Sequence, residues 1–410
     1  MNVNGIFGTG RSMGAKKILL LPFAQLLYVG IWALSKVIKI HIYRVSNDRI
    51  GHFAMDTELT RLNSLERKSS EKWALNIYCA RYAKSSNDFL TKIWKRELHY
   101  LSGTFGSLIG VLAGRDKKSN LCKSMPFTDS LGLLLKYPHT IRFSKPEINE
   151  GDSFLRNIGL ERGQPFVCLN VRDSAFLTET EPISWSETRD WTYHDYRNSD
   201  IDTYIKAAET LADAGYAVFR MGAIVKKELK SRHSLVFDYA TNGMRTEFLD
   251  FYLGSQCTFT ISTGSGWCSI PDLFRKPLLF VNNLPTTDFI TLALKHIVYP
   301  KILQDKKTKK TLGLTEIIAR DIQITHETNC YVSAGAEIRD MNSDELVEAV
   351  TEMAARVKGT FVETHEQKLM QEKLKHVLST HPKLQPTPNY YPVRAEYASC
   401  FLSNYPNFLD

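Results

Sequence analysis

The sequence predicts an α/β protein of two domains preceded by an apolar helix. At 410 residues the chain is too long for one ordinary domain. Short apolar runs alternate with helical patterns, which is typical of parallel strands joined by helical crossovers. Apolar residues make up 43% of the chain and charged residues 23%. This composition is that of a globular protein, and it excludes a disordered, collagenous, coiled-coil or polytopic membrane protein.

The first segment, residues 1–36, contains seventeen consecutive uncharged residues over 18–34. A helix of that length is about 26 Å long, against about 30 Å for the hydrocarbon core of a bilayer. Basic residues flank it on both sides, so its orientation is not determined. Three interpretations remain open: a membrane helix or shallow anchor, a helix packed on the domain, or a signal peptide cleaved near Ala33-Leu34-Ser35. We expect membrane association.

The first domain is predicted over 37–150. It opens with a strand at 38–45, a polar loop and a helix at 53–65, which is the usual first unit of an open α/β domain. A second strand at 76–79 and a helix at 88–98 follow. No element is assigned with certainty over 99–145. The polar stretch 145–164 is interpreted as the interdomain linker, with a short helical signal.

The second domain is predicted over 151–360, with a C-terminal extension over 361–410. Its strands and helices alternate, which predicts a parallel, Rossmann-like sheet. The expected strands are 165–173, 216–221, 235–239, 257–262 and 278–282. The expected helices are 202–215, 246–255, 267–275 and 344–357, the last with Ser343 as its N-cap.

A loop rich in glycine and serine follows the strand at 257–262 and is the sharpest functional signal. It consists of Ser262, Thr263, Gly264, Ser265 and Gly266. Ligands of parallel sheets bind at the carboxyl ends of the strands. Glycines permit close backbone approach, and a helix start offers free N–H groups to phosphate. The alternative is an ordinary strand-to-helix turn. The loop lacks the lysine of a P-loop.

Other strand ends are expected to reach the same edge of the sheet. Arg172 and Asp173 follow one strand, and Arg220 and Gly222 follow another. The two arginines are candidates for bidentate binding of a diphosphate, with surface ion pairs as the alternative. The long loop 174–200 contains His194-Asp195-Tyr196-Arg197-Asn198 and could cover a ligand.

In the first domain, Asp48 and His52 follow the first strand, and His52 is a candidate general base. A structural hydrogen bond at the helix start is the alternative. Asp56 and Glu58 are weaker carboxylate candidates. The pair Asp200 and Asp202 forms a D-x-D pattern that binds metal in some transferases. Here it precedes a helix, which favours N-capping.

The net charge of +8 is unevenly distributed. Residues 1–150 carry 23 basic and 11 acidic side chains, whereas the remainder carries 29 and 33. A basic N-terminal part is suited to an anionic membrane surface or a phosphorylated substrate. No nucleic-acid motif accompanies it, so no nucleic-acid partner is expected. The seven cysteines form no C-x-x-C pair, which indicates a reducing compartment.

Four stretches resemble a glycosyltransferase family encoded in bacterial surface-polysaccharide gene clusters, over about residues 38–360. They are DRIGHFAMDTEL, FVCLNVRDSAF, WTYHDYRNSDIDTYIKAAETLADAGYAVFRMG and TFTISTGSGWCSIPDLFRKPLLFVNN. The resemblance implies a GT-B-like architecture, in which two Rossmann-like domains face each other across a cleft. It further implies that the C-terminal domain binds the sugar nucleotide, that the N-terminal domain binds the acceptor, and that neither a metal nor another cofactor is required.

The function expected from the sequence is therefore transfer of a sugar from a nucleotide-diphosphate donor to a surface-polysaccharide or lipid-linked glycan acceptor. The expected location is the cytoplasm, at the inner face of the cell membrane. Two alternatives remain: a nucleotide-sugar epimerase of the same fold, and a non-catalytic glycan-assembly protein on the membrane. Product analysis distinguishes a transferase from an epimerase, because an epimerase needs no acceptor. A measurement of nucleotide binding distinguishes a transferase from the non-catalytic protein, which should bind no nucleotide.

Overall fold

A computed structural model describes residues 15–67, 74–179, 190–287, 296–384 and 395–409. The described residues divide into two compact units, unit 1 ending at Phe127 and unit 2 beginning at Thr128. Each unit contains one all-parallel sheet. The predicted α/β class and the N-terminal apolar helix are confirmed. Residues 128–150, which the sequence assigned to the first domain, belong to unit 2.

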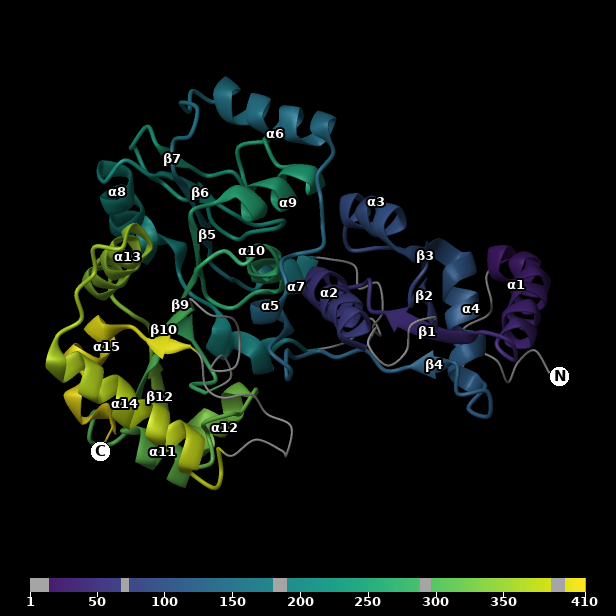
Figure 1. Ribbon diagram of the computed structural model, residues 1–410. Coiled ribbons are helices and arrows are strands. Elements are labelled where there is room, and N and C mark those ends of the chain that lie inside the picture. The colour runs from purple at the N-terminus through teal and green to yellow at the C-terminus, as the bar shows by residue number, and fades with distance from the viewer. Residues whose placement is uncertain (1–14, 68–73, 180–189, 288–295, 385–394, 410) are drawn as a thin grey trace. The chain divides into compact units, whose positions relative to one another are not determined.

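Unit 1 is built on a four-stranded sheet of order β3-β2-β1-β4 (Figure 1). The strands are β1 (Lys39–Val45), β2 (Ala74–Ala80), β3 (His99–Leu101) and β4 (Cys122–Lys123). The helices are α1 (Ala15–Leu34), α2 (Ile50–Glu66), α3 (Asp88–Glu97) and α4 (Gly103–Arg115). Both β3 and α4 lie in the stretch that the sequence left unassigned.

Helix α1 packs beside α4 at one side of this sheet (Figure 1). Leu21, Ala24 and Ile31 are buried in a core that also contains Ile109 of α4 and Ile42 of β1. The helix is long and apolar enough to cross a membrane by length and composition. One of its faces is nevertheless an integral part of unit 1.

Unit 2 is built on a seven-stranded sheet of order β13-β10-β9-β8-β5-β6-β7. The strands are β5 (Phe166–Asn170), β6 (Ala217–Arg220), β7 (Val236–Phe237), β8 (Phe259–Ser262), β9 (Leu278–Asn283), β10 (Ile297–Pro300) and β13 (Glu396–Tyr397). From β5 the chain adds β6 and β7 on one side and then β8 to β10 on the other. This is the doubly wound order, whose switch point lies between β5 and β8.

Helices and a small antiparallel pair, β11 (Ile302–Asp305) with β12 (Ala336–Arg339), complete unit 2. The α-helices are α5 (Leu133–Lys136), α6 (Lys145–Asn157), α7 (Ala175–Glu179), α8 (Ile205–Asp213), α9 (Glu247–Gln256), α10 (Ser269–Leu273), α11 (Leu314–Ala319), α12 (Thr328–Ser333), α13 (Ser343–Lys358), α14 (His365–Thr380) and α15 (Ser399–Asn404). The 3-10 turns are η3 (Thr192–Arg197), η4 (Ile201–Tyr204), η5 (Gly266–Cys268) and η6 (Pro406–Leu409).

Two local predictions differ from the structure. The stretch interpreted as a linker begins with the thirteen-residue helix α6, which starts at a capping box formed by Ser144 and Glu147. The predicted N-cap of α13, Ser343, is wrong by one position. Asn342 is the cap, since its side chain accepts hydrogen bonds from the backbone N–H groups of Asp344 and Glu345.

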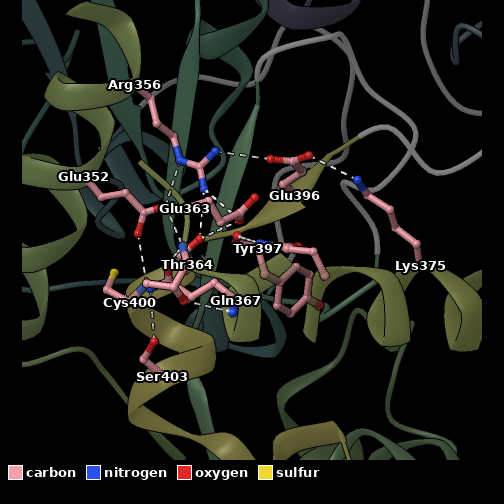
Figure 2. A network of polar contacts seen from close by, with 12 residues as sticks. Glu352, Arg356, Glu363, Thr364, Gln367, Lys375, Glu396, Tyr397, Cys400 and Ser403 are labelled. Atoms are coloured by element: carbon pink, nitrogen blue, oxygen red, sulfur yellow. Dashed lines mark hydrogen bonds and ion pairs between the residues drawn. The ribbon is translucent and has the colours of Figure 1, made fainter. Parts of the chain in front are cut away.

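The C-terminal segment is part of the unit 2 core, because β13 pairs in parallel with β10. A polar network fastens it to α13 (Figure 2). Arg356 donates to Glu352 at 2.8 Å and to Glu396 at 3.2 Å, and also contacts Glu363 at 3.6 Å. Glu352 in turn accepts the backbone N–H groups at the start of α15. One guanidinium therefore holds together three carboxylates from separate segments.

We expect Arg356→Ala to lower the free energy of unfolding by about 2 kcal/mol, because it leaves three partly buried carboxylates without their shared cation. Urea unfolding followed by tryptophan fluorescence measures the change. The matched control is Lys206→Ala, which removes an ion pair between α8 and α13 whose side chains are 62% and 78% exposed. That change should cost less than about 1 kcal/mol. An equal loss in the free energy of unfolding for the two variants would contradict the stabilising role given to Arg356.

Candidate anion-binding site

The carboxyl ends of β5 and β8 meet at the switch point of the unit 2 sheet. Asn170 and Ser262 are partners in the β5–β8 register. The backbone carbonyl of Asn170 accepts the N–H of Thr263 at 3.1 Å, and its side-chain oxygen accepts the hydroxyl of Ser265. The hydroxyl of Thr263 accepts the backbone N–H of Arg172 at 2.8 Å. These bonds tie the Gly-Ser loop to the residues that follow β5.

The backbone of the Gly-Ser loop presents two hydrogen-bond donors at this edge. Gly264 has φ +79°, a conformation that residues with a side chain rarely adopt. The N–H groups of Gly264 and Trp267 are used within the loop, by the hydroxyls of Ser262 and Ser265. Within the described ranges, the N–H groups of Ser265 and Gly266 have no acceptor. The helical run that follows, η5 and α10, is short, so these two donors are the main feature offered to an anion.

Two arginines converge on the same loop. Arg197, at the end of η3, donates to the carbonyl of Gly264. Arg172 donates to the side-chain oxygen of Asn198 at 2.6 Å and to the carbonyl of His194 at 3.2 Å. Among the residues that the structure describes, neither arginine has a carboxylate within ion-pair distance. Within the described part of the chain, the two positive charges therefore have no carboxylate as a permanent ion-pair partner.

The two arginines destabilise each other electrostatically. Burial and the neighbouring charge of Arg197 lower the pKa of Arg172 to about 10. Arg172 remains protonated at neutral pH, so the repulsion persists there. A bound anion would relieve it, because opposite charge stabilises both guanidinium groups.

A buried lysine that the sequence analysis did not single out supports the loop carrying Arg197. Lys301 donates to the carbonyl of Asn198 and to a carboxylate oxygen of Asp340, each at 2.6 Å. Burial lowers the pKa of Lys301, while Asp340 raises it. Hydrogen bonds from Lys301 to Asn198 and from Arg172 to Asn198 therefore hold the Arg172 guanidinium in place. No sequence motif marks Lys301, because it lies between β10 and β11, far along the chain.

The remaining predicted donor-site residues of unit 2 have other roles in the structure. Asp173 accepts the N–H of Ala175, the first residue of α7, at 2.9 Å and the N–H of Lys226 at 2.7 Å, so it joins two loops. Gly222 lies in the second of these loops, where a Cβ would collide with Val225. Arg220 is 1% exposed and donates to Asp238 at 3.1 Å. Its guanidinium is thus used inside the fold, and we do not place it in the anion site.

The D-x-D pair behaves as a helix cap. The side chain of Asp200 accepts the backbone N–H of Asp202 at the start of η4, as the sequence analysis expected. Both carboxylates also bind Lys227, at 2.8 Å and 3.1 Å. The described residues contain no group of three or more His, Cys, Asp or Glu side chains placed to hold a metal ion.

His52 in unit 1 forms a pair with Asp56 rather than with Asp48. The two lie one turn apart on α2, with 3.0 Å between Nδ1 of His52 and the Asp56 carboxylate. This hydrogen bond raises the pKa of His52 above its ordinary 6.5, and burial raises the pKa of Asp56. Nε2 of His52 has no partner among the described residues. Asp48 lies in the loop ahead of α2 and contributes a smaller electrostatic effect.

Comparison with known proteins finds similarity only at the level of structure. No protein-family model matches the chain, and no curated protein matches it in sequence. Escherichia coli ADP-heptose lipopolysaccharide heptosyltransferase II is 13% identical with a TM-score of 0.42, covering 65% of this chain and 91% of that one. A glycosyl transferase family 9 structure from Veillonella parvula is 9% identical with a TM-score of 0.45, covering 78% and 98%.

A third solved structure, E. coli heptosyltransferase WaaC with ADP-2-deoxy-2-fluoro heptose, is 10% identical with a TM-score of 0.29 and covers 64% and 93%. At these TM-scores the similarities do not decide what this chain binds or catalyses. Its function has to be argued from its own residues.

The pKa of His52 should lie above 6.5 in a nuclear magnetic resonance titration of its imidazole. In Asp56→Asn the charged hydrogen-bond acceptor is lost while the burial that disfavours the imidazolium remains, so the pKa should fall. Asp48→Asn is the matched control and should cause a smaller decrease. An unchanged pKa in Asp56→Asn would show that the pair does not form in solution.

Proposed function

We propose that this chain is a glycosyltransferase that takes a sugar from a nucleotide-diphosphate donor and passes it to a glycan or lipid-linked hydroxyl. One observation carries the proposal. Arg172 and Arg197, without a carboxylate partner among the described residues, lie at the same edge of the sheet as two unused N–H groups of the Gly-Ser loop. This set of donors at the switch point of a doubly wound sheet suits the diphosphate of a nucleotide.

In the proposed reaction the acceptor hydroxyl oxygen attacks the anomeric carbon of the donor sugar. The bond between that carbon and the diphosphate oxygen breaks, and the diphosphate leaves with the electron pair. Negative charge grows on the leaving group as the bond breaks. Arg172, Arg197 and the N–H groups of Ser265 and Gly266 would stabilise this charge, because they are fixed before the reaction begins.

The proton of the acceptor hydroxyl needs a base, and we propose His52 for this role. Asp56 accepts from Nδ1–H, which leaves the lone pair of the neutral ring on Nε2. The imidazole side chain is 45% exposed, so Nε2 is open to solvent and to a substrate. The same arrangement makes Asp56 a positioning residue, since it sets the tautomer and stabilises the imidazolium that forms.

Arg197→Ala should weaken binding of a nucleoside diphosphate by about tenfold or more, since it removes a charged donor from the site. Isothermal titration calorimetry with ADP, UDP and GDP measures the loss, and a thermal melt checks that unit 2 is folded. The matched control is Arg162→Ala, which removes an exposed arginine from unit 2. Equal affinities in Arg197→Ala, Arg162→Ala and the unchanged protein would refute the assignment.

Sugar transfer should be lost in Arg172→Ala and strongly reduced in His52→Gln, while nucleotide binding persists in His52→Gln. Because the neutral imidazole is the base, activity should fall as pH decreases through the raised pKa of His52, and Asp56→Asn should move this fall to lower pH. ADP-heptose is the first donor to assay, and UDP and GDP sugars are the next. A sugar converted without any acceptor would indicate an epimerase, and absence of nucleotide binding would indicate a non-catalytic protein.

A further inference from the structure

Helix α1 has one face held in unit 1. Leu21, Ala24 and Ile31 are buried against α4 and the sheet. Tyr28, on the same face, donates its hydroxyl to a carboxylate oxygen of Asp116 at 2.9 Å. Asp116 follows α4 directly, so apolar contacts and a hydrogen bond both fasten the helix to this unit.

The opposite face of α1 is apolar and exposed. Leu19, Phe23, Leu26 and Val29 have 70%, 62%, 74% and 58% of their surface accessible. Their spacing of three and four residues places them in one stripe along the helix. Trp32 and Leu34 extend the exposed apolar surface near the end of the helix. A continuous stripe of this kind on a soluble protein marks an interaction surface.

Basic residues lie beyond both ends of the stripe and on the segment that ends α4. The helix carries no charge between Lys17 and Lys36, and Nζ of Lys36 lies 4.6 Å from the ring centre of Trp32. The segment bonded to Tyr28 carries three exposed basic residues, Arg115 at the end of α4 and then Lys117 and Lys118. Apolar side chains with a basic border and a tryptophan near one end fit the boundary between acyl chains and anionic headgroups.

We propose that α1 lies in the plane of an anionic lipid leaflet, with the Leu19–Val29 stripe among the acyl chains and its other face still packed on unit 1. A transmembrane orientation would require α1 to leave unit 1, exposing its apolar contacts with α4 and the sheet and breaking the bond to Asp116. A second copy of the chain is a poor occupant, since a two-fold contact would bring the same basic residues together. The proposal does not depend on the proposed glycosyl transfer.

Flotation with vesicles tests the proposal. The full chain should float with vesicles containing phosphatidylglycerol and much less with pure phosphatidylcholine vesicles. Leu26→Glu should reduce the bound fraction about tenfold or more, because a carboxylate in the stripe opposes insertion. Its fold should survive, as Leu26 is 74% exposed. Leu369→Glu, at a 51% exposed leucine of α14, is the matched control and should float like the unchanged chain.

The outcomes separate the alternatives. The proposal would be overturned if Leu26→Glu floated as well as the unchanged chain. It would also be overturned if the unchanged chain did not float with the vesicles. A concentration-dependent dimer that Leu26→Glu abolishes, without lipid binding, would assign the stripe to a second copy.

A second measurement separates a helix in the leaflet from one that crosses it. In inverted membrane vesicles from an expressing bacterium, an N-terminal tag and a C-terminal tag should both be open to protease. A protected N-terminal tag would show that α1 spans the membrane, and loss of that tag by cleavage near Ser35 would show a signal peptide. Either result would contradict the proposal.

Discussion

The parallel pairing of β5 with β8 is the constraint on which the candidate site depends. With Asn170 opposite Ser262, the two strands end together: Arg172 follows β5 two residues later, and the rest of the Gly-Ser loop follows β8. A shift of one residue would reverse the face of every side chain in β8, because side chains alternate along a strand. Both strands are buried, which fixes the register. The hydrogen bonds of Asn170 then extend this order into loops that have no regular structure of their own.

The arginine pair is electrostatically unfavourable for the folded state. Arg172 and Arg197 repel each other, and the carboxylates of Asp195 and Asp173 act favourably on Arg172 without forming an ion pair with it. Lys301 adds a buried cation near Arg172, although Asp340 compensates it. The fold tolerates this arrangement because Asn198 and two backbone carbonyls accept the hydrogen bonds of these side chains.

Patterning of strands and helices predicted the fold well where apolar periodicity was strong. The predicted strand at 278–282 is β9, and the helix at 344–357 is α13, each within a residue or so. Prediction failed where local signals were weak: α6 is a polar helix that a capping box begins, and β3 is three residues long. The domain boundary also moved, because tertiary contacts assign residues 128–150 to unit 2.

The candidate site was predictable only in part. Arg172, Arg197 and the Gly-Ser loop could be found because they follow strands or lie in a long loop of the same domain. Lys301 could not, since nothing in its neighbourhood distinguishes it from a surface lysine. Arg220 was misleading for the opposite reason: its position at a strand end is correct, but a partner 18 residues later, Asp238, uses its guanidinium inside the fold. Side-chain pairing is a tertiary property that spacing along the chain does not reveal.

The pairing of β13 with β10 has a consequence for how the protein is made. All strands of unit 1 lie before residue 124, so that sheet can form while the ribosome is still translating unit 2. The unit 2 sheet and the core around Phe401 and Phe408 instead need residues near 400. Until these leave the ribosome, much apolar surface of unit 2 stays uncovered. The two units therefore differ in how much chain they need: the unit 1 sheet is complete by residue 123, whereas the unit 2 core needs residues near 400.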